Sequence, residues 1–526
     1  MPDYLNAVTD TGVYKLERTG DNEYSSDGIA VEFAIEGSVM SVHLAAPSES
    51  VHFLNLRWHG GFPTGCRVFG DHWERGYGDL EWRGIVPERV MPWFFIAWDG
   101  KTASGYGVKT GASSFCLWRA DSEGISLRID VRSGSEGVML GDRILNAAEI
   151  VSLGGLDNES PFRFAGRFCR KLCDAPRLPD HPVYGANDWY YAYGDSTHET
   201  ILRDADMLVS LSPGTSNRPY MVVDAGWAQL AGIWAEAVNG TKWDHGNKRF
   251  PDMPGLADQI KQKGARPGIW IRPLAVPADC NPALLLDGAR YMNPLTAAPI
   301  LDPSISDNLS KIEEDMRTLN SWGYRMIKHD FTSFDILGRW GFEMSADLTN
   351  PGWHFADRSK TTAEIVVGMY KAIRRGAGDS LIIGCNTFGH LAAGLVELQR
   401  TGDDTSGMEW ERTRKMGVNT LAFRMPHHQA FYLSDADCVG LTQKVPWDLN
   451  RQWLDVLSRS GTPLFVSAEP AAVGSDQRSA LKAAYEHASK PQPFGEPLDW
   501  MDTTCPSHWR FGDETVEYNW IPDSGI

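Results

Sequence analysis

The chain has 526 residues, of which 42% are hydrophobic and 22% are charged, and its formal net charge is −18. A chain of this length exceeds the size of one hydrophobic core, so we expect two or three domains. The acidic balance argues against nucleic acid as a partner, because a phosphate backbone requires a basic protein surface.

The sequence lacks the usual signs of a membrane protein or of a bound cofactor. No apolar stretch approaches the roughly 20 residues of a membrane helix, and the N-terminus has no secretory signal pattern. The eight cysteines are scattered without a C-x-x-C pair, which is typical of a reduced compartment. We therefore expect a cytoplasmic protein with no membrane partner. Nucleotide-binding motifs and cysteine–histidine clusters are also missing, so we expect no cofactor and no metal.

Residues 1–175 contain short runs in which apolar and polar residues alternate, separated by Gly, Ser, Asp and Asn. Examples are Ile29–Ile35, Val39–Leu44 and Ile125–Val131. A period of two is typical of antiparallel sheets with one solvent-exposed face. We predict an N-terminal β-sandwich over this part of the chain.

From residue 176 to 495, short apolar strands alternate with longer amphipathic segments. The predicted strands are Val183–Tyr191, Tyr220–Trp227, Arg266–Pro273, Tyr324–Asp330, Leu381–Asn386, Val396–Asp404, Phe431–Asp437 and Pro463–Glu469. A doubly wound sheet would also alternate strands and helices, but eight β/α units favour a barrel. We predict an α/β fold with a (β/α)8 TIM barrel, followed by a short C-terminal β segment over residues 496–526.

Polar residues gather at the ends of these predicted strands, where a barrel of this kind places its chemistry. The fourth strand closes on Lys328, His329 and Asp330. The sixth closes on Asp403 and Asp404. Retaining hydrolysis of a glycosidic bond needs two such carboxylates, one to attack the anomeric carbon and one to protonate the leaving oxygen.

Asp330 suits the attacking role, because Lys328 points to the same side of the strand and keeps a neighbouring carboxylate ionised. A Lys–Asp pair that only holds a loop is the alternative. For the acid/base, Asp403 and Asp404 compete. Adjacent residues of an extended segment point opposite ways, so we expect only one of the two to face a pocket.

Four aromatic residues lie at predicted strand ends, where their rings could stack on the apolar face of a sugar. They are Trp189, Tyr191, Trp227 and Trp270, and packing in the core is the alternative for each. Arg272 follows Trp270 by two residues and lies on the same face. An arginine at this place binds an anion or pairs with a pocket carboxylate.

Taken together, these strand ends resemble glycoside hydrolase family 36, the α-galactosidases and their relatives, over residues 183–440. Six segments are similar to family motifs in the same order. They are Val223-Asp-Ala-Gly-Trp227 (D-D-G-Y/W), Pro267-Gly-Ile-Trp270 (G-I-W), Lys328-His-Asp330 (K-x-D), Gly384-Cys-Asn386 (G-C-G), Arg400-Thr-Gly-Asp-Asp-Thr405 (R-x-x-x-D-T) and Leu433-Ser-Asp-Ala-Asp-Cys438 (L-N-D-P-D-C). The resemblance implies a β-sandwich, a (β/α)8 barrel and a C-terminal β-domain, which is shorter here than in the family.

The resemblance also implies roles for individual residues. Asp330 becomes the nucleophile and Asp404 the acid/base. The spacing from Arg400 favours Asp404 over Asp403 for this role. The other expected substrate-binding residues are Arg400 beside the acid, Lys328 at ring hydroxyls, Trp270 in the pocket wall, Asp224 at a hydroxyl far from the anomeric carbon, and Trp189, Tyr191, Trp227, Arg272, Cys385 and Asn386.

Two positions depart from the family pattern where the sugar is recognised. Ala225 replaces one of the paired aspartates that hold the axial 4-OH and the 6-OH of galactose. Its loss removes one or two charge-assisted hydrogen bonds, each worth about 1.5–3 kcal/mol. Arg272 stands where an uncharged or acidic residue is usual. A C6-altered galactoside, another α-glycoside and a sugar with an anionic group are therefore candidate substrates beside galactosides.

The sequence predicts a retaining α-glycoside hydrolase, α-galactosidase-like, that acts on a small carbohydrate by double displacement and needs no cofactor. The alternatives are a transglycosylase with the same catalytic residues, a sugar-binding protein without turnover, and a barrel enzyme that uses a Schiff-base lysine or a metal triad. Because the family often self-associates, a homo-oligomer is expected.

Overall fold

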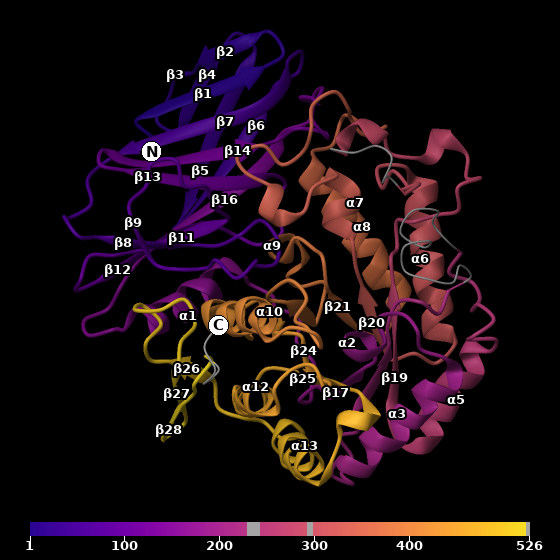
Figure 1. Ribbon diagram of the computed structural model, residues 1–526. Coiled ribbons are helices and arrows are strands. Elements are labelled where there is room, and N and C mark those ends of the chain that lie inside the picture. Colours follow the sequence, from indigo (N-terminus) through magenta and orange to yellow (C-terminus); the bar gives the residue numbers. More distant parts are fainter. Residues whose placement is uncertain (229–241, 292–297, 522–526) are drawn as a thin grey trace.

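The computed structural model describes residues 1–228, 242–291 and 298–521. Two antiparallel sheets form the N-terminal part, and a ring of parallel strands with helices on its outside forms the central part (Figure 1). The predicted fold class, a β-sandwich followed by a TIM barrel, is confirmed. In the described ranges no helix combines the length and the apolar character needed to cross a membrane.

The sandwich consists of a seven-stranded and a nine-stranded sheet. The first has the order β10 (Met91–Pro92), β13 (Phe115–Asp121), β14 (Gly124–Asp130), β7 (Ser50–His59), β1 (Tyr4–Thr9) and β2 (Gly12–Lys15), with β15 (Val138–Met139) paired to β7. The second has the order β3 (Glu17–Arg18), β4 (Glu23–Ser26), β5 (Ile29–Glu36), β6 (Val39–Ala45), β16 (Leu145–Gly154), β12 (Ala103–Val108), β11 (Phe94–Trp98), β8 (Arg67–Gly70) and β9 (Arg83–Gly84).

The apolar and polar residues that alternate in the sequence are alternately buried and exposed in these strands. In β5, Val31 and Phe33 are buried, whereas Glu32 and Ala34 are exposed. Successive side chains of a strand point to opposite faces, so one face of β5 packs in the sandwich core and the other meets solvent. After the sandwich, α1 (Pro161–Leu172) begins at the N-cap residue Ser160, whose side chain accepts a hydrogen bond from the backbone of Arg163.

The barrel sheet joins its strands in parallel, and each of the eight predicted segments contains one of them. They are β17 (Tyr184–Asn187), β18 (Tyr220–Val223), β19 (Arg266–Ile271), β20 (Met326–His329), β21 (Leu381–Gly384), β22 (Leu398–Arg400), β23 (Leu433–Asp435) and β25 (Leu464–Ala468). All four residues of β20 are buried, as expected for a strand with helices on one face and barrel interior on the other.

The seventh strand of the barrel is broken, and the break closes the ring. β23 pairs with β22, whereas β24 (Cys438–Leu441) pairs with β25. Only Ala436 and Asp437 separate the two halves, and Asp437 takes a left-handed conformation with φ of 73°. The bend turns the chain from one neighbour to the other and places the Asp437 carboxylate at the mouth of the barrel.

Long helices between the strands cover the outside of the barrel, and short ones lie near the ends of the strands (Figure 1). They are α2 (Trp189–Ala192), α3 (His198–Leu211), α5 (Met253–Lys263), α6 (Ser306–Ser321), α7 (Thr332–Leu337), α8 (Thr362–Ala377), α9 (Gly389–Ala392), α10 (Trp410–Thr413), α11 (Thr420–Arg424), α12 (Trp447–Arg459) and α13 (Ser475–Ala488), with a π-helical stretch over Arg414–Asn419. The predicted helical segments 307–321 and 362–375 correspond to α6 and α8.

The end of the described chain forms a small antiparallel sheet of β26 (Gly495–Pro497), β27 (His508–Phe511) and β28 (Glu514–Glu517). The segment before β27 packs on both larger parts. Trp500 contacts the ring of Phe69 in β8 at 5.5 Å between centroids, and Asn419 of the barrel donates a hydrogen bond to the carbonyl of Thr504 at 2.7 Å.

A loop of the sandwich, residues 71–80, enters the mouth of the barrel. Gly76 forms an isolated parallel bridge with Gly402, which follows β22. The amide of Gly76 donates to the carbonyl of Thr401 at 2.8 Å, and the amide of Asp403 donates to the carbonyl of Gly76 at 2.9 Å. The sandwich therefore contributes directly to the part of the barrel where its strands end.

Candidate active site

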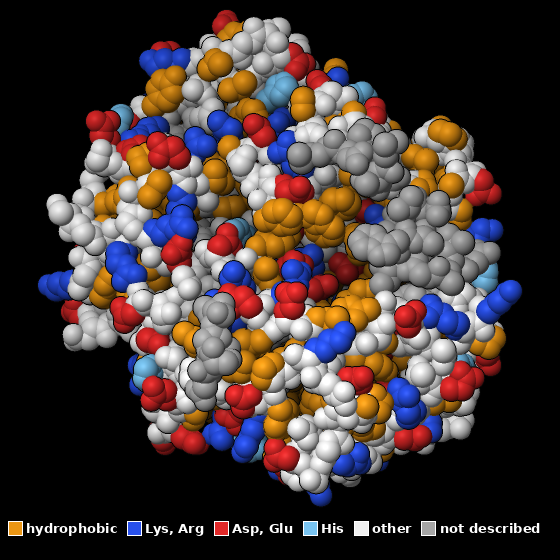
Figure 2. Space-filling model, viewed as in Figure 1, with side chains coloured by type: hydrophobic (Ala, Val, Ile, Leu, Met, Phe, Trp, Pro, Cys, Tyr) orange, Lys and Arg blue, Asp and Glu red, His pale blue; other side chains and the backbone are white. Residues whose placement is uncertain are grey.

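A cavity of about 330 Å³ opens at the C-terminal ends of the barrel strands. Its lining residues are Arg75, Tyr77, Trp189, Asp224, Ala225, Trp243, Trp270, Arg272, Lys328, Asp330, Phe331, Trp340, Phe342, Asp403, Asp404 and Arg412. Figure 2 shows acidic and basic side chains gathered in the hollow at the centre of this face, next to hydrophobic side chains. The volume and the mixture of rings and charges suit a small polar molecule with apolar faces, such as a sugar.

Asp330 stands directly after β20, where the chain leaves the strand. Phe331 takes a left-handed conformation with φ of 63°, which turns the backbone so that its amide donates to Oδ1 of Asp330 at 2.8 Å. The indole Nε1 of Trp270, on the neighbouring strand, donates to Oδ2 at 3.2 Å. Both oxygens thus accept one neutral hydrogen bond each, which fixes the carboxylate without an ion pair at its own atoms.

Lys328 is buried in the wall of the same cavity and is paired with Asp224. Its Nζ lies 2.7 Å from Oδ2 of Asp224, and this oxygen also accepts from the side chain of Asn187 at 2.6 Å. Burial opposes the charge of Lys328, but the charge of Asp224 outweighs burial and raises the pKa of the ammonium group well above its usual value. Lys328 is therefore a fixed cation and not a nucleophile.

Asp188, which follows β17, is a buried carboxyl group behind Asp224. Its Oδ1 accepts a hydrogen bond from the backbone amide of Asp224 at 2.8 Å. Burial and the negative charge of Asp224 raise the pKa of Asp188 to about 7. Near neutral pH the Asp188 carboxyl group therefore carries a proton for part of the time.

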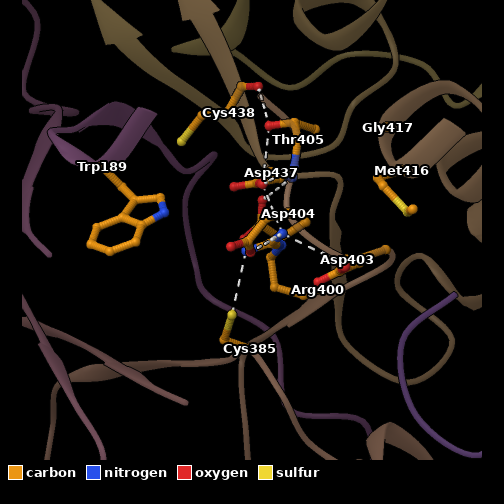
Figure 3. A network of polar contacts seen from close by, with 12 residues as sticks. Trp189, Cys385, Arg400, Asp403, Asp404, Thr405, Met416, Gly417, Asp437 and Cys438 are labelled. Carbon is orange, nitrogen blue, oxygen red and sulfur yellow. Dashed lines mark hydrogen bonds and ion pairs between the residues drawn. The ribbon is translucent and has the colours of Figure 1, made fainter. Parts of the chain in front are cut away.

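Asp404 lies in the loop after β22 and is held by a network that starts at Asp437 (Figure 3). Oδ2 of Asp437 accepts from Nη2 of Arg400 at 2.7 Å, from the amide of Thr405 at 2.8 Å and from the hydroxyl of Tyr190. The same Nη2 of Arg400 lies 3.2 Å from Oδ1 of Asp404. Asp437 therefore fixes both the arginine and the loop that present Asp404 to the cavity.

Asp404 is the more exposed of the two neighbouring aspartates, with 37% of its side chain accessible against 17% for Asp403. Burial would raise its pKa, but the charges of Arg400 and Arg75 outweigh burial and lower the pKa of Asp404 to about 2. In the free protein the Asp404 carboxyl group is thus ionised at neutral pH.

Asp403 also lines the cavity, so the expectation that only one of the two aspartates faces it is wrong. β22 ends at Arg400, and the following loop does not keep the alternation of a strand. Two arginines hold Asp403, with Arg75 at 2.7 Å from Oδ1 and Arg412 at 2.8 Å from Oδ2. Both of its oxygens are therefore engaged, which leaves Asp404 as the aspartate with room for a ligand.

Arg272 lines the cavity but is bound to a carboxylate of the protein. Its Nε and Nη2 lie 3.0 Å and 2.6 Å from the two oxygens of Asp335 in α7, and its guanidinium covers the ring of Phe331. Burial disfavours the charge, but Asp335 outweighs it and raises the pKa of Arg272. Of the two roles expected from the sequence, the observed one is pairing with a carboxylate.

The structure places several other expected site residues behind the cavity wall. Trp227 is fully buried and donates from Nε1 to the carbonyl of Trp270 at 2.8 Å, so it supports that ring. Tyr191 lies in α2 and donates to Asp204 of α3, away from the cavity, because β17 ends at Asn187 and the chain turns into a helix. Trp189 in the same helix does line the cavity.

Cys385, Asn386 and Arg400 are likewise buried and absent from the cavity lining. Nη1 of Arg400 lies 3.3 Å from Sγ of Cys385, and the Asn386 side chain donates to Glu74. Arg400 lies beneath Asp404, and its contacts hold that carboxylate and Asp437; the expected contact of this arginine with the sugar stays a prediction.

Sequence reasoning missed the residues that reach the cavity from other segments. Arg75 and Tyr77 come from the sandwich loop, Trp340 and Phe342 come from the segment after α7, and Arg412 comes from α10. The sandwich loop does carry a signal, since charged and aromatic residues, among them Glu74, Arg75 and Tyr77, cluster around Gly76 and Gly78. Within the described residues no group of three or more His, Cys, Asp or Glu side chains is arranged to hold a metal ion.

No known protein-family profile matches the sequence. The α-galactosidase TtGalA from Thermus thermophilus, solved with p-nitrophenyl α-D-galactopyranoside, superposes with a TM-score of 0.63 at 17% identity over 98% of this chain and 99% of that chain. The GH36 α-galactosidase AgaA from Geobacillus stearothermophilus superposes with a TM-score of 0.63 at 14% identity over 97% and 79%. The chain has the fold of the family 36 α-galactosidases.

This likeness extends across the sandwich and the barrel together. The α-galactosidase from Lactobacillus brevis also superposes, with a TM-score of 0.59 at 11% identity over 91% of this chain and 72% of that chain. Variants of AgaA were solved with raffinose and with stachyose, so those neighbours bind oligosaccharides. The resemblance inferred from six short motifs is thus confirmed at the level of the fold.

Proposed function

We propose that this protein is a retaining α-glycoside hydrolase, α-galactosidase-like, that acts on small carbohydrates. The observation that carries the proposal is the pair Asp330 and Asp404, which face one cavity from the ends of β20 and the loop after β22. They are held in different ways, Asp330 by neutral donors and Asp404 by arginines. Two carboxyl groups in unlike environments are the arrangement that divides nucleophile from acid/base.

In the first step Asp330 attacks the anomeric carbon, the bond to the leaving oxygen breaks, and that oxygen receives a proton from Asp404 or from solvent. In the second step Asp404 removes a proton from a water molecule, which attacks the same carbon and releases Asp330. The hydrogen bonds from Trp270 and Phe331 orient the Asp330 carboxylate for the attack. Because Asp404 is ionised in the free protein, it can accept the proton of this water molecule.

Asp224, Lys328 and Trp270 are the residues that we propose bind the sugar in this cavity. Asp224 accepts from Lys328, from Asn187 and from the amide of Ala225, which leaves one acceptor position of the carboxylate for a hydroxyl group. Ala225 offers no polar group at the neighbouring position. Because Arg272 is paired with Asp335, a neutral sugar fits this wall better than an anionic one.

The alternatives from the sequence are not equally supported. A Schiff-base lysine must lose its proton to react, whereas the pKa of Lys328 is raised by Asp224. A transglycosylase would use the same two aspartates, and product analysis with excess sugar acceptor separates transfer from hydrolysis. A binding protein without turnover would not need Asp404 to be held open to the cavity.

The test is a panel of aryl α- and β-glycosides assayed with the wild-type protein and with Asp330→Asn. We expect an α-glycosidase activity that falls by at least about 10³-fold in the variant, since removing a nucleophile removes the covalent path. In Asp330→Ala, which leaves room where the carboxylate stood, added azide should partly restore turnover and give the β-glycosyl azide, because azide attacks from the face that Asp330 would attack. Wild-type rates in Asp330→Asn would refute the mechanism.

A further inference from the structure

Three aromatic side chains form a rim at the outer end of the cavity, and the mechanism above does not use them. The rim consists of Tyr77, Trp340 and Phe342. Phe342 has 63% of its surface exposed, which is unusual for a phenylalanine beside charged catalytic groups. Its ring contacts Tyr77 edge to face with 5.1 Å between centroids, and Trp340 stacks on Phe334 at 4.3 Å.

Hydrogen bonds join the two segments that carry this aromatic rim. Phe342 is therefore held in its exposed position. The amide of Gly341 donates to Oε1 of Glu74 at 2.7 Å and lies 3.1 Å from the hydroxyl of Tyr77. Glu74 also accepts from Ser333 and from Asn386. A Cβ at Gly341 would lie 2.5 Å from Cγ of Glu74, so only glycine permits this approach.

The polar groups next to the aromatic rim are already paired within the protein. Arg75 and Arg412 both bind Asp403, and the guanidinium of Arg75 covers the rings of Trp340 and Tyr77 at 5.6 Å and 5.9 Å. The surface left for a ligand is therefore the faces and edges of aromatic rings, with few donors or acceptors to satisfy the hydroxyl groups of a second sugar.

We propose that the aromatic rim of Tyr77, Trp340 and Phe342 is the subsite for an aryl aglycone, and that the substrates of this enzyme are α-glycosides of phenolic compounds. The inference rests on the proposed function and adds the leaving group to it. An aromatic aglycone stacks against rings and needs no hydrogen bonds there. The rim adjoins the carboxylates in one cavity, so an aglycone on it stays attached to a sugar at Asp330.

The chemistry of the leaving group agrees with this assignment. When Asp330 forms its bond to the anomeric carbon, the electron pair of the broken bond passes to the phenolic oxygen, and the phenolate then takes a proton from water. Such a group departs with little help from an acid, whereas the alkoxide of a sugar needs a proton. Because the charges around Asp404 keep it ionised, phenolic leaving groups are favoured over sugars in the first step.

The experiment compares three α-glycosides of the sugar identified by the panel: the phenyl glycoside, the trifluoroethyl glycoside and the glycosyl fluoride. The second has an acidic but non-aromatic leaving group, and the third has no aglycone to bind. Phe342→Ala should lower kcat/KM for the phenyl glycoside by about fivefold and leave the other two unchanged. Phe342→Tyr keeps the ring and should keep the wild-type pattern, and Phe494→Ala is the control at an exposed phenylalanine outside the cavity.

The outcomes separate the two proposals. The aglycone subsite is overturned if Phe342→Ala changes kcat/KM equally for all three substrates, or changes it for none. Hydrolysis of the glycosyl fluoride would still support the proposed glycosidase function. If the wild-type protein hydrolyses no glycoside of the panel and none of the corresponding glycosyl fluorides, the proposed function fails, and the subsite proposal fails with it.

Discussion

Removing the charge of Arg75 should raise the pKa of Asp404 and shift the pH dependence of catalysis. Nη1 of Arg75 lies 3.9 Å from Oδ1 of Asp404. Two charges at this distance interact by about 1 kcal/mol in water and about 4 kcal/mol at an effective dielectric constant of 20. Because 37% of the Asp404 side chain is exposed, solvent screening reduces the effect to about 1–2 kcal/mol, or about one pKa unit.

The sign follows from the loss of a cation: Arg75→Met destabilises the ionised form of Asp404, so the pKa of Asp404 rises by about one unit. A substrate with a poor leaving group requires protonated Asp404, and the basic limb of its kcat/KM profile should move to higher pH by about one unit. Arg75→Lys keeps the charge and serves as the matched control. Hydrolysis of the glycosyl fluoride should not shift, because fluoride needs no acid.

Thermal unfolding of both Arg75 variants checks that the fold is intact. We expect a modest loss of stability in Arg75→Met, because Asp403 retains Arg412 at 2.8 Å. The reasoning is refuted if the pH profile of Arg75→Met coincides with that of the wild type, or if the lysine variant shifts by the same amount as the methionine variant.

Three further predictions concern buried contacts. The folded state holds a proton on Asp188 up to about pH 7, whereas an unfolded aspartate releases it near pH 4, so stability falls by up to about 4 kcal/mol as pH rises through this window. Asp188→Asn should flatten that slope in melts from pH 5 to 8, and an unchanged slope contradicts the assignment. Asp437→Asn leaves Arg400 without its nearest charge and should cost about 3 kcal/mol in urea unfolding; a loss below 1 kcal/mol would count against the network. Gly341→Ala places a methyl group against Glu74 and should lower kcat/KM for phenyl glycosides about tenfold. If the contact between Gly341 and Glu74 serves only to position the aglycone subsite, kcat/KM for the glycosyl fluoride must not change.

The barrel could be predicted because each of its strands is marked by a pattern within a few consecutive residues. Each strand is a short apolar run that ends on polar residues, and the segment before Asp330 shows both features within seven residues. β20 and Asp330 appear where the pattern predicts them, because a buried parallel strand must be apolar and its end must turn towards solvent. The same logic placed Lys328 and Trp270 on the cavity side of neighbouring strands.

The errors arose where a strand ended earlier than its apolar run. The prediction extended the first strand to Tyr191, but the chain becomes helical at Trp189, which points Tyr191 towards Asp204. The sixth strand stops at Arg400, so Asp403 and Asp404 lie in a loop that brings both to the cavity. Strand ends depend on which neighbour supplies the next hydrogen bond, and a single sequence does not contain that information.

The partners of the charged residues were also beyond the reach of local patterns. The sequence left open whether Arg272 binds an anion or pairs with a carboxylate, because its partner Asp335 lies 63 residues further along the chain. Arg75 belongs to a different part of the fold from the carboxylates that it contacts. Such pairs are set by how the elements pack, so spacing along the sequence could suggest the chemistry of these residues but not their partners.

The insertion of the sandwich loop into the barrel has a consequence for the order of events during folding. Glu74 and Asn386, which hold the loop in place, are 312 residues apart in the chain. During synthesis the loop emerges long before the strand that it must meet, and contacts of such long separation form slowly. The sandwich can therefore be complete while the pocket still lacks one wall. The proposed catalysis requires that the loop around Glu74 has joined the strand end at Asn386, so activity would report on this long-range contact.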